Sequence, residues 1–137
     1  MKVYIDTSAF CALTNPKDRH NLRAKEIYLG LEAARPIIHT SDYVLDEIYT
    51  LLRIRASHNA AVNFMNGMDK SNIIVLRMSE DIIEAAKTIF RRYDDKKLSF
   101  TDCTSFALIN NFCIDAVFAF DEHFKYQPYS HTVSILE

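Results

Sequence analysis

Two aspartates in this chain each stand directly after a short apolar run. Asp6 follows Val3-Tyr4-Ile5, and Asp121 follows the apolar residues 116–120. Runs of this length and composition favour β-strands, so each carboxylate is predicted at the carboxyl end of a strand. In an open α/β sheet, ligands bind at that edge. An aspartate after a strand can also simply begin a turn, and the pair alone therefore indicates a site only weakly.

Two further acids stand near the starts of predicted helices. Glu47 belongs to a helix predicted over residues 43–53, and at about 100° per residue it lies beside the apolar stripe of that helix. Asp46 lies on the opposite face and is expected at the surface. Asp102 stands in the first turn of another helix, where Ser99 and Asp102 fit a capping box. Glu47 is therefore a candidate site residue, whereas Asp102 taken alone reads better as a capping residue.

The elements that would position these acids alternate between strands and pairs of helices. Apolar runs predict strands over residues 3–5, 37–40, 73–76, 116–120 and 132–136, the last of them at an edge. Amphipathic stretches predict helices over residues 9–13, 18–34, 43–53, 57–69, 79–90 and 99–109. Because crossover connections are right-handed, this order predicts an α/β fold. We expect a three-layer α/β/α sandwich around a mainly parallel sheet of four or five strands.

Local signals also predict where the helices begin and which side chains they bury. Polar residues that can cap a helix precede the first three helices: Thr7 or Ser8, Asp18, and Ser41 or Asp42. The second helix is expected to bury Leu22, Ile27 and Leu31. His39 has no second histidine or cysteine at ligand spacing and is interpreted as a structural residue.

The predicted topology brings the four acids to one place. Asp6 and Asp121 end strands at one edge of a parallel sheet, and the helices that carry Glu47 and Asp102 begin at that edge. Four unpaired carboxylates would repel one another and raise each other's pKa values. Mg²⁺ or Mn²⁺ would relieve this repulsion, because both ions bind carboxylate oxygens and water. One or two such ions could activate a water and stabilise the leaving oxygen in a phosphoryl displacement.

Composition limits the class of protein without selecting a function. The 137 residues predict a single domain over residues 1–137, and an apolar fraction of 49% argues against disorder. No apolar run is long enough for a transmembrane span, so no membrane partner is expected. Three cysteines without metal-type spacing favour a reducing cytoplasm. The net charge of −2 does not exclude an RNA partner, because bound cations would cancel part of the acidic charge.

The segments that carry the four acids resemble the four motifs of PIN-domain ribonucleases, with the VapC-like toxins as the most similar branch. The segments are Asp6-Thr7-Ser8 and residues 41–47, 98–102 and 120–124. They occur in the family's order over essentially the whole chain. The resemblance implies catalytic metal ligands at Asp6, Glu47, Asp102 and Asp121, with supporting hydroxyls at Ser8 and Thr101. One position departs from the pattern: many members carry Thr or Ser two residues before the fourth acid, where this chain has Ala119.

The resemblance implies a ribonuclease that hydrolyses RNA phosphodiester bonds with Mg²⁺ or Mn²⁺. It also implies the toxin of a toxin–antitoxin pair, with a homodimeric form and a cognate antitoxin protein as partner. The alternative is a PIN-like fold without catalysis that serves as a binding or assembly module, and the presence of all four acids argues against it. A haloacid-dehalogenase-type phosphatase would need Asp-x-Asp after the first strand, and Asp6-Thr7-Ser8 does not supply it.

Overall fold

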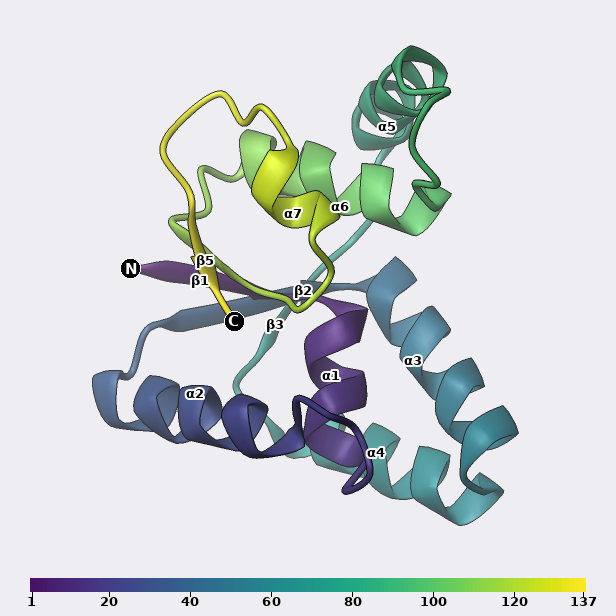
Figure 1. Ribbon diagram of the computed structural model, residues 1–137, viewed down its shortest axis with the longest axis vertical. Helices are drawn as coiled ribbons and strands as arrows, with labels where there is room; N and C mark the ends of the chain where they lie inside the picture. Colours follow the sequence, from purple (N-terminus) through teal and green to yellow (C-terminus); the bar gives the residue numbers. More distant parts are fainter.

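The computed structural model describes residues 1–137 and contains one sheet of five parallel strands together with seven helices (Figure 1). The strands are β1 (Lys2–Ile5), β2 (Ile37–Ser41), β3 (Ile74–Leu76), β4 (Ala116–Phe118) and β5 (Ser134–Leu136). The helices are α1 (Thr7–Thr14), α2 (Asn21–Ala34), α3 (Asp42–Arg55), α4 (His58–Lys70), α5 (Glu80–Arg92), α6 (Phe100–Asn111) and α7 (His123–Tyr126). The strand order is β3-β2-β1-β4-β5, and all neighbours are parallel. The predicted fold class is confirmed.

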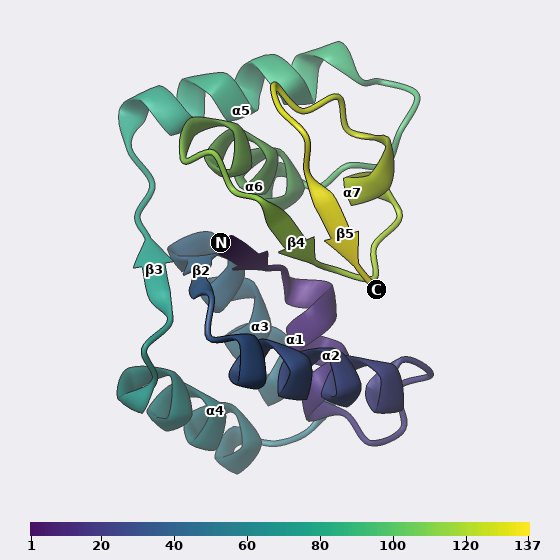
Figure 2. The ribbon, with the colours of Figure 1, turned by 90° about the vertical axis from the view of Figure 1, so that its left-hand side faces the viewer.

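The helices form two layers around the sheet. Helices α1 to α4 lie on one side of it and α5 to α7 on the other (Figures 1 and 2). β1 occupies the centre of the sheet and pairs with β2 on one side and β4 on the other. Because the strands are parallel, their carboxyl ends share one edge, and the segments after β1 and β4 leave the sheet beside each other. The backbone N–H of Asp6 donates to the carbonyl of Phe118 at 3.1 Å, which fixes this neighbourhood.

The core is built on the two most apolar strands. Val3, Tyr4 and Ile5 of β1 are fully buried, as are Val117 and Phe118 of β4. Strands covered by helices on both faces read as such continuous apolar runs. Tyr4 also carries a hydroxyl into the core. This hydroxyl forms a hydrogen bond of 2.8 Å with the hydroxyl of Ser105 on α6. This bond ties the central strand to the helix that carries Asp102.

Serine residues cap α3, α5 and α6, and the caps of α3 and α6 were predicted. The hydroxyl of Ser41 accepts a hydrogen bond from the N–H of Val44 at the start of α3. Ser79 caps α5 in the same way. Ser99 and Asp102 form the expected capping box, with each side chain accepting the other residue's backbone N–H. These short-range patterns form because the bonded groups lie within one helical turn of each other.

The first two helices begin differently from the prediction. Asp6 itself caps α1, because its carboxylate accepts the N–H of Ser8, and neither Thr7 nor Ser8 serves as the cap. α2 begins at Asn21 and not after Asp18, since the Asp18 carboxylate accepts the N–H of His20 within the preceding turn.

The prediction that α2 buries Leu22 is wrong. Leu22 is 78% exposed, whereas Asn21, Ala24 and Leu31 are buried. The amide of Asn21 donates to the carbonyl of Ala12 at 2.7 Å. This hydrogen bond allows the polar Asn21 to occupy the buried position that was predicted for Leu22. The helix is therefore rotated by about one residue from the orientation that its apolar residues predict.

The end of the chain contains an element that the sequence did not predict. β4 ends at Phe118, and a single helical turn, α7, follows Asp121. β5 lies at the edge of the sheet beside β4, as expected. None of the helices combines the length and apolar character needed to cross a membrane.

Candidate functional site

Asp6 is the most buried acid of the candidate site. It follows the central strand directly, caps α1 and is only 3% exposed. Its Oδ2 accepts hydrogen bonds from the hydroxyl of Ser8 at 2.7 Å and from the N–H of Ser8 at 3.0 Å. Burial raises the pKa of the Asp6 carboxyl from 3.8 to about 7; the bonds from Ser8 oppose the rise, and the charge of Asp102 adds to it. The fold therefore holds a carboxylate where its negative charge is poorly solvated.

Ser8 links Asp6 to the segment after β4. While its hydroxyl donates to Asp6, the same oxygen accepts the N–H of Phe120 at 3.0 Å and that of Asp121 at 3.3 Å. One hydroxyl thus sets the position of the first acid and of the backbone that carries the fourth. The Ser8 hydroxyl, which was expected to support the acids, thus contacts both Asp6 and the segment that carries Asp121. Ala119 is fully buried and has no hydroxyl to add a further hydrogen bond.

Asp102 and Asp121 approach each other from α6 and from the turn before α7. Burial raises the pKa of the Asp102 carboxyl to about 6, and the negative charge of Asp121 adds to the rise. One ligand atom from each of Asp102, Asp121 and His123 lies within 4.8 Å of the other two. Nδ1 of His123 lies 3.0 Å from Oδ1 of Asp121, yet at an angle that makes no hydrogen bond. This cluster joins nitrogen and oxygen donors on one side of the site.

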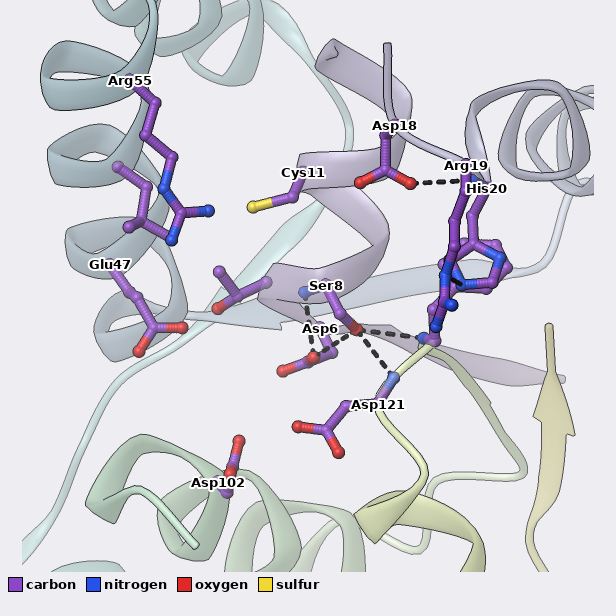
Figure 3. A pocket seen from close by; sticks show the side chains of 13 residues that line it. Asp6, Ser8, Cys11, Asp18, Arg19, His20, Glu47, Arg55, Asp102 and Asp121 are labelled. Atoms are coloured by element: carbon purple, nitrogen blue, oxygen red, sulfur yellow. Dashed lines mark hydrogen bonds between the residues drawn. The ribbon is translucent and has the colours of Figure 1, made fainter. Parts of the chain in front are cut away.

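Glu47 completes the set from the third side. It lies on α3, half-buried, on the same helix face as Leu51 and Arg55, which follow at intervals of four residues. Asp46 is exposed on the other face, as predicted. One cavity of about 540 Å³ is lined by all four predicted acids and Ser8. Figure 3 shows the carboxylates of the four acids directed toward a common centre.

Basic groups border this acidic cavity without neutralising it. Arg55 lines it on the side of Glu47, and Arg19 lines the opposite side together with His20 (Figure 3). Neither arginine forms a salt bridge with an acid. The cavity therefore combines a carboxylate cluster that lacks a lysine or arginine partner with two guanidinium groups at its rim that pair with no acid. This distribution suits a ligand that carries negative charge and reaches the carboxylates through a cation.

Thr101 is the one predicted site residue that the structure does not bring to the cavity. It borders a separate hollow beside Asp42 and Asp46. Its carbonyl accepts a hydrogen bond from the hydroxyl of Thr104 at 2.6 Å, which is a bond within α6. Thr101 makes no hydrogen bond to any of the four acids.

Several cavity residues were not assigned from the sequence. Arg55 could have been found, because it lies two helical turns after Glu47 on the same face. His123, which clusters with Asp102 and Asp121 but lines a neighbouring cavity, lies two residues after Asp121, and a two-residue interval outside a predicted helix or strand indicates no particular arrangement. Cys11, His20 and Phe120 reach the cavity from separate segments, and no local pattern predicts their meeting.

Comparison with known proteins decides the family. The PIN domain matches residues 3–128 of the chain. The chain belongs to the PIN-domain family. A relative from Mycobacterium tuberculosis, 23S rRNA-specific endonuclease VapC20, is 34% identical over 123 residues, which are 90% of this chain and 92% of that protein. The predicted resemblance is confirmed.

Solved structures agree with this assignment. The crystal structure of Mycobacterium tuberculosis VapC20, described as a Sarcin-Ricin loop cleaving toxin, matches with a TM-score of 0.80 at 34% identity and covers 90% of this chain and 92% of that one. FitAcB from Neisseria gonorrhoeae matches with a TM-score of 0.69 at 15% identity, over 98% of this chain and 96% of that one. A toxin–antitoxin complex from Klebsiella pneumoniae gives 0.61 at 19% identity, over 88% and 87%. The last two show the shared fold alone.

The donor set of this PIN domain fits a hard divalent cation. Carboxylate oxygens predominate, which suits Mg²⁺ and Mn²⁺, and the nitrogen donor that clusters with Asp102 and Asp121, His123, suits Mn²⁺ better than Mg²⁺. Burial raises the pKa values of Asp6 and Asp102, and none of the four acids forms a salt bridge with a lysine or an arginine. Nδ1 of His123 is buried and has no hydrogen-bond partner. These features are expected where a cation completes the site.

Proposed function

We propose that this chain is an endoribonuclease and the toxin of a toxin–antitoxin pair, with cleavage that depends on Mg²⁺ or Mn²⁺. The observation that carries the proposal is the convergence of Asp6, Glu47, Asp102 and Asp121 on one cavity. These four residues would hold the cation and act as the catalytic residues. A divalent cation bound there would supply an activated water and neutralise charge on the phosphate that is cleaved.

The protein's own residues would hold the reacting groups in place. Ser8 fixes the orientation of the Asp6 carboxylate through two hydrogen bonds, so that Oδ1 of Asp6 is left free to face the cavity. The caps of α1 and α6 hold Asp6 and Asp102 on rigid helix starts. Arg19 and Arg55, on opposite sides of the carboxylates, would contact RNA phosphates on either side of the cleaved bond. Asp6 and Asp102 must lose their protons before a cation binds, which couples binding to pH.

The substrate we propose is the sarcin–ricin loop of 23S ribosomal RNA. The support is the relative at 34% identity that is named for cleavage of 23S rRNA and described as cleaving that loop. Since ribosomal RNA lies in the cytoplasm of bacteria and archaea, this substrate implies cytoplasmic action. We further propose a homodimer and a cognate antitoxin protein; the antitoxin is supported by the solved structure from Klebsiella pneumoniae, which has the same fold and is described as a toxin–antitoxin complex.

The alternative is a PIN domain without catalysis that serves as a binding or assembly module. Such a module would have no need to keep Asp6 buried at a cost in stability, or to leave four acids uncompensated. Several acids with raised pKa values in one cavity are more typical of a functional site than of a structural one.

Cleavage of a synthetic sarcin–ricin hairpin tests the proposal. The purified chain is incubated with the hairpin and with a hairpin of scrambled loop sequence, in Mg²⁺, in Mn²⁺ and in excess EDTA, and product ends are mapped. We expect cleavage of the first hairpin only, and none in EDTA. Asp102→Asn should abolish cleavage while the circular dichroism spectrum is unchanged, and Asp46→Asn, on the exposed face of α3, should cleave normally.

Three results would contradict parts of the proposal separately. Cleavage that persists in EDTA rules out the dependence on a cation. Equal cleavage of both hairpins rules out the sarcin–ricin loop as the specific substrate and leaves the nuclease activity standing. Absence of cleavage of either hairpin and of total RNA, with folded protein and either cation, favours the binding module.

A further inference from the structure

One wall of the cavity is a stacked pair of rings drawn from distant parts of the chain. The imidazole of His20 and the ring of Phe120 lie with centroids 4.4 Å apart and planes inclined by only 8°. His20 comes from the turn before α2, and Phe120 immediately precedes Asp121. Both rings line the cavity, and both are partly exposed. A flat aromatic surface therefore stands beside the carboxylates.

Hydrogen bonds on both sides hold this pair in place. The N–H of His20 donates to the Asp18 carboxylate at 2.8 Å, and Nε of Arg19 donates to Nε2 of His20 at 3.1 Å. The N–H of Phe120 donates to the hydroxyl of Ser8, which also bonds to Asp6. The rings are thus fixed relative to the acids through one hydroxyl. Figure 3 shows Arg19 and His20 on the side of the cavity opposite Glu47 and Arg55.

We propose that His20 and Phe120 form a nucleobase subsite, in which the base of a nucleotide next to the cleaved phosphate stacks on the ring of His20. This inference rests on the proposed ribonuclease function and adds to it the element that positions the RNA strand. Arg19 and Arg55 supply the charge that phosphates require, but a guanidinium at the rim does not fix the rotation of a nucleotide. A ring at the cavity wall does so, because a stacked base has one plane available to it.

The chemistry of the wall favours a base over other ligands. Every nucleobase presents a flat π-face, and proteins that bind single-stranded or unpaired RNA stack bases on Phe, Tyr, Trp or His. Nε of Arg19 donates to Nε2 of His20, and this bond engages the edge of the ring and not its faces. The guanidinium of Arg19 keeps its remaining N–H groups for a phosphate or a base edge. Sugar and phosphate alone would leave the ring surface in contact with water.

The test compares RNA with and without the base at the subsite. The nucleotides on either side of the bond that the wild-type protein cleaves are replaced, one at a time, by abasic residues in the sarcin–ricin hairpin. Values of kcat and KM are measured for the wild type, His20→Ala, His20→Phe and Tyr126→Ala. Tyr126 is an exposed aromatic residue outside the cavity and serves as the control. Thermal unfolding confirms that each variant is folded.

We expect His20→Ala to raise KM about tenfold for intact RNA, with kcat nearly unchanged, since a stacked base contributes equally before and during reaction. His20→Phe should restore KM, because a ring returns. With RNA that is abasic at one of the two positions, the wild type and His20→Ala should have equal KM values. Tyr126→Ala should have the same KM as the wild type for every RNA. A loss in His20→Ala that is the same for intact RNA and for both abasic RNAs overturns the subsite.

The outcome separates the subsite from the function on which it rests. If the wild type cleaves the hairpin while His20→Ala shows no dependence on either base, the subsite is wrong and the nuclease stands. If the wild type cleaves no RNA with Mg²⁺ or Mn²⁺, the proposed function is wrong and the subsite falls with it.

Discussion

Replacement of Asp6 by asparagine should stabilise the metal-free protein at neutral and alkaline pH. The carboxyl is 3% exposed, and burial raises its pKa from 3.8 to about 7. A raised pKa in the folded state means that the native protein binds a proton more tightly than the unfolded chain does. Stability is therefore lost as the pH rises from about 4 to about 7. The amide of the Asp6→Asn variant has no charge to bury and does not incur this loss.

The size of the effect follows from the pKa. Each tenfold change in proton affinity corresponds to about 1.4 kcal/mol, so a carboxyl whose pKa rises from 3.8 to about 7 destabilises the ionised protein by about 4 kcal/mol. The side chain of the Asp6→Asn variant can still accept the two hydrogen bonds from Ser8 through its amide oxygen. We therefore expect this variant to match the wild type near pH 4 and to exceed it by up to about 4 kcal/mol near pH 8.

Urea unfolding in EDTA over a series of pH values measures this difference. Asp46→Asn, which removes an exposed acid from α3, is the matched control and should show a small difference at every pH. Added Mn²⁺ should stabilise the wild type and not Asp6→Asn, because only the wild type keeps the full ligand set. A variant that is less stable than the wild type at pH 8 in EDTA, or whose advantage does not change with pH, would refute the reasoning.

Three further predictions concern the same groups. Ser8→Ala should weaken Mn²⁺ binding about tenfold, because Asp6 loses its 2.7 Å hydrogen bond, and calorimetry that finds unchanged affinity would contradict this role for Ser8. Mn²⁺ affinity of the wild type should rise with pH and level off above about pH 8, about one unit above the pKa of Asp6, where Asp6 and Asp102 are both ionised, and a titration with no pH dependence would disagree with their raised pKa values. Tyr4→Phe should lower the free energy of unfolding by about 1–2 kcal/mol in urea, through loss of its buried bond to Ser105, and should leave RNA cleavage intact.

All five strands, the first six helices and the set of four acids could be predicted from the sequence alone. The apolar runs at β1 and β4, and the serine caps of α3, α5 and α6, depend on interactions within a few residues, which a linear pattern records directly. The alternation of strands and helices then limited the topology to a parallel sheet, and the edge of that sheet gathered Asp6, Glu47, Asp102 and Asp121. The family prediction from the four motifs is confirmed as well. The roles of individual site residues stay predictions.

The surroundings of those acids depend on contacts between distant segments, which no local pattern predicts. Ser8 and Phe120 are 112 residues apart, and their hydrogen bond exists only because β1 and β4 are neighbours. The same holds for the stack of His20 on Phe120. The burial of Asn21 in place of Leu22 depends on the carbonyl of Ala12, to which its amide donates. A sequence pattern states which side chains can be polar or apolar, but the packing of distant segments determines which of them meet.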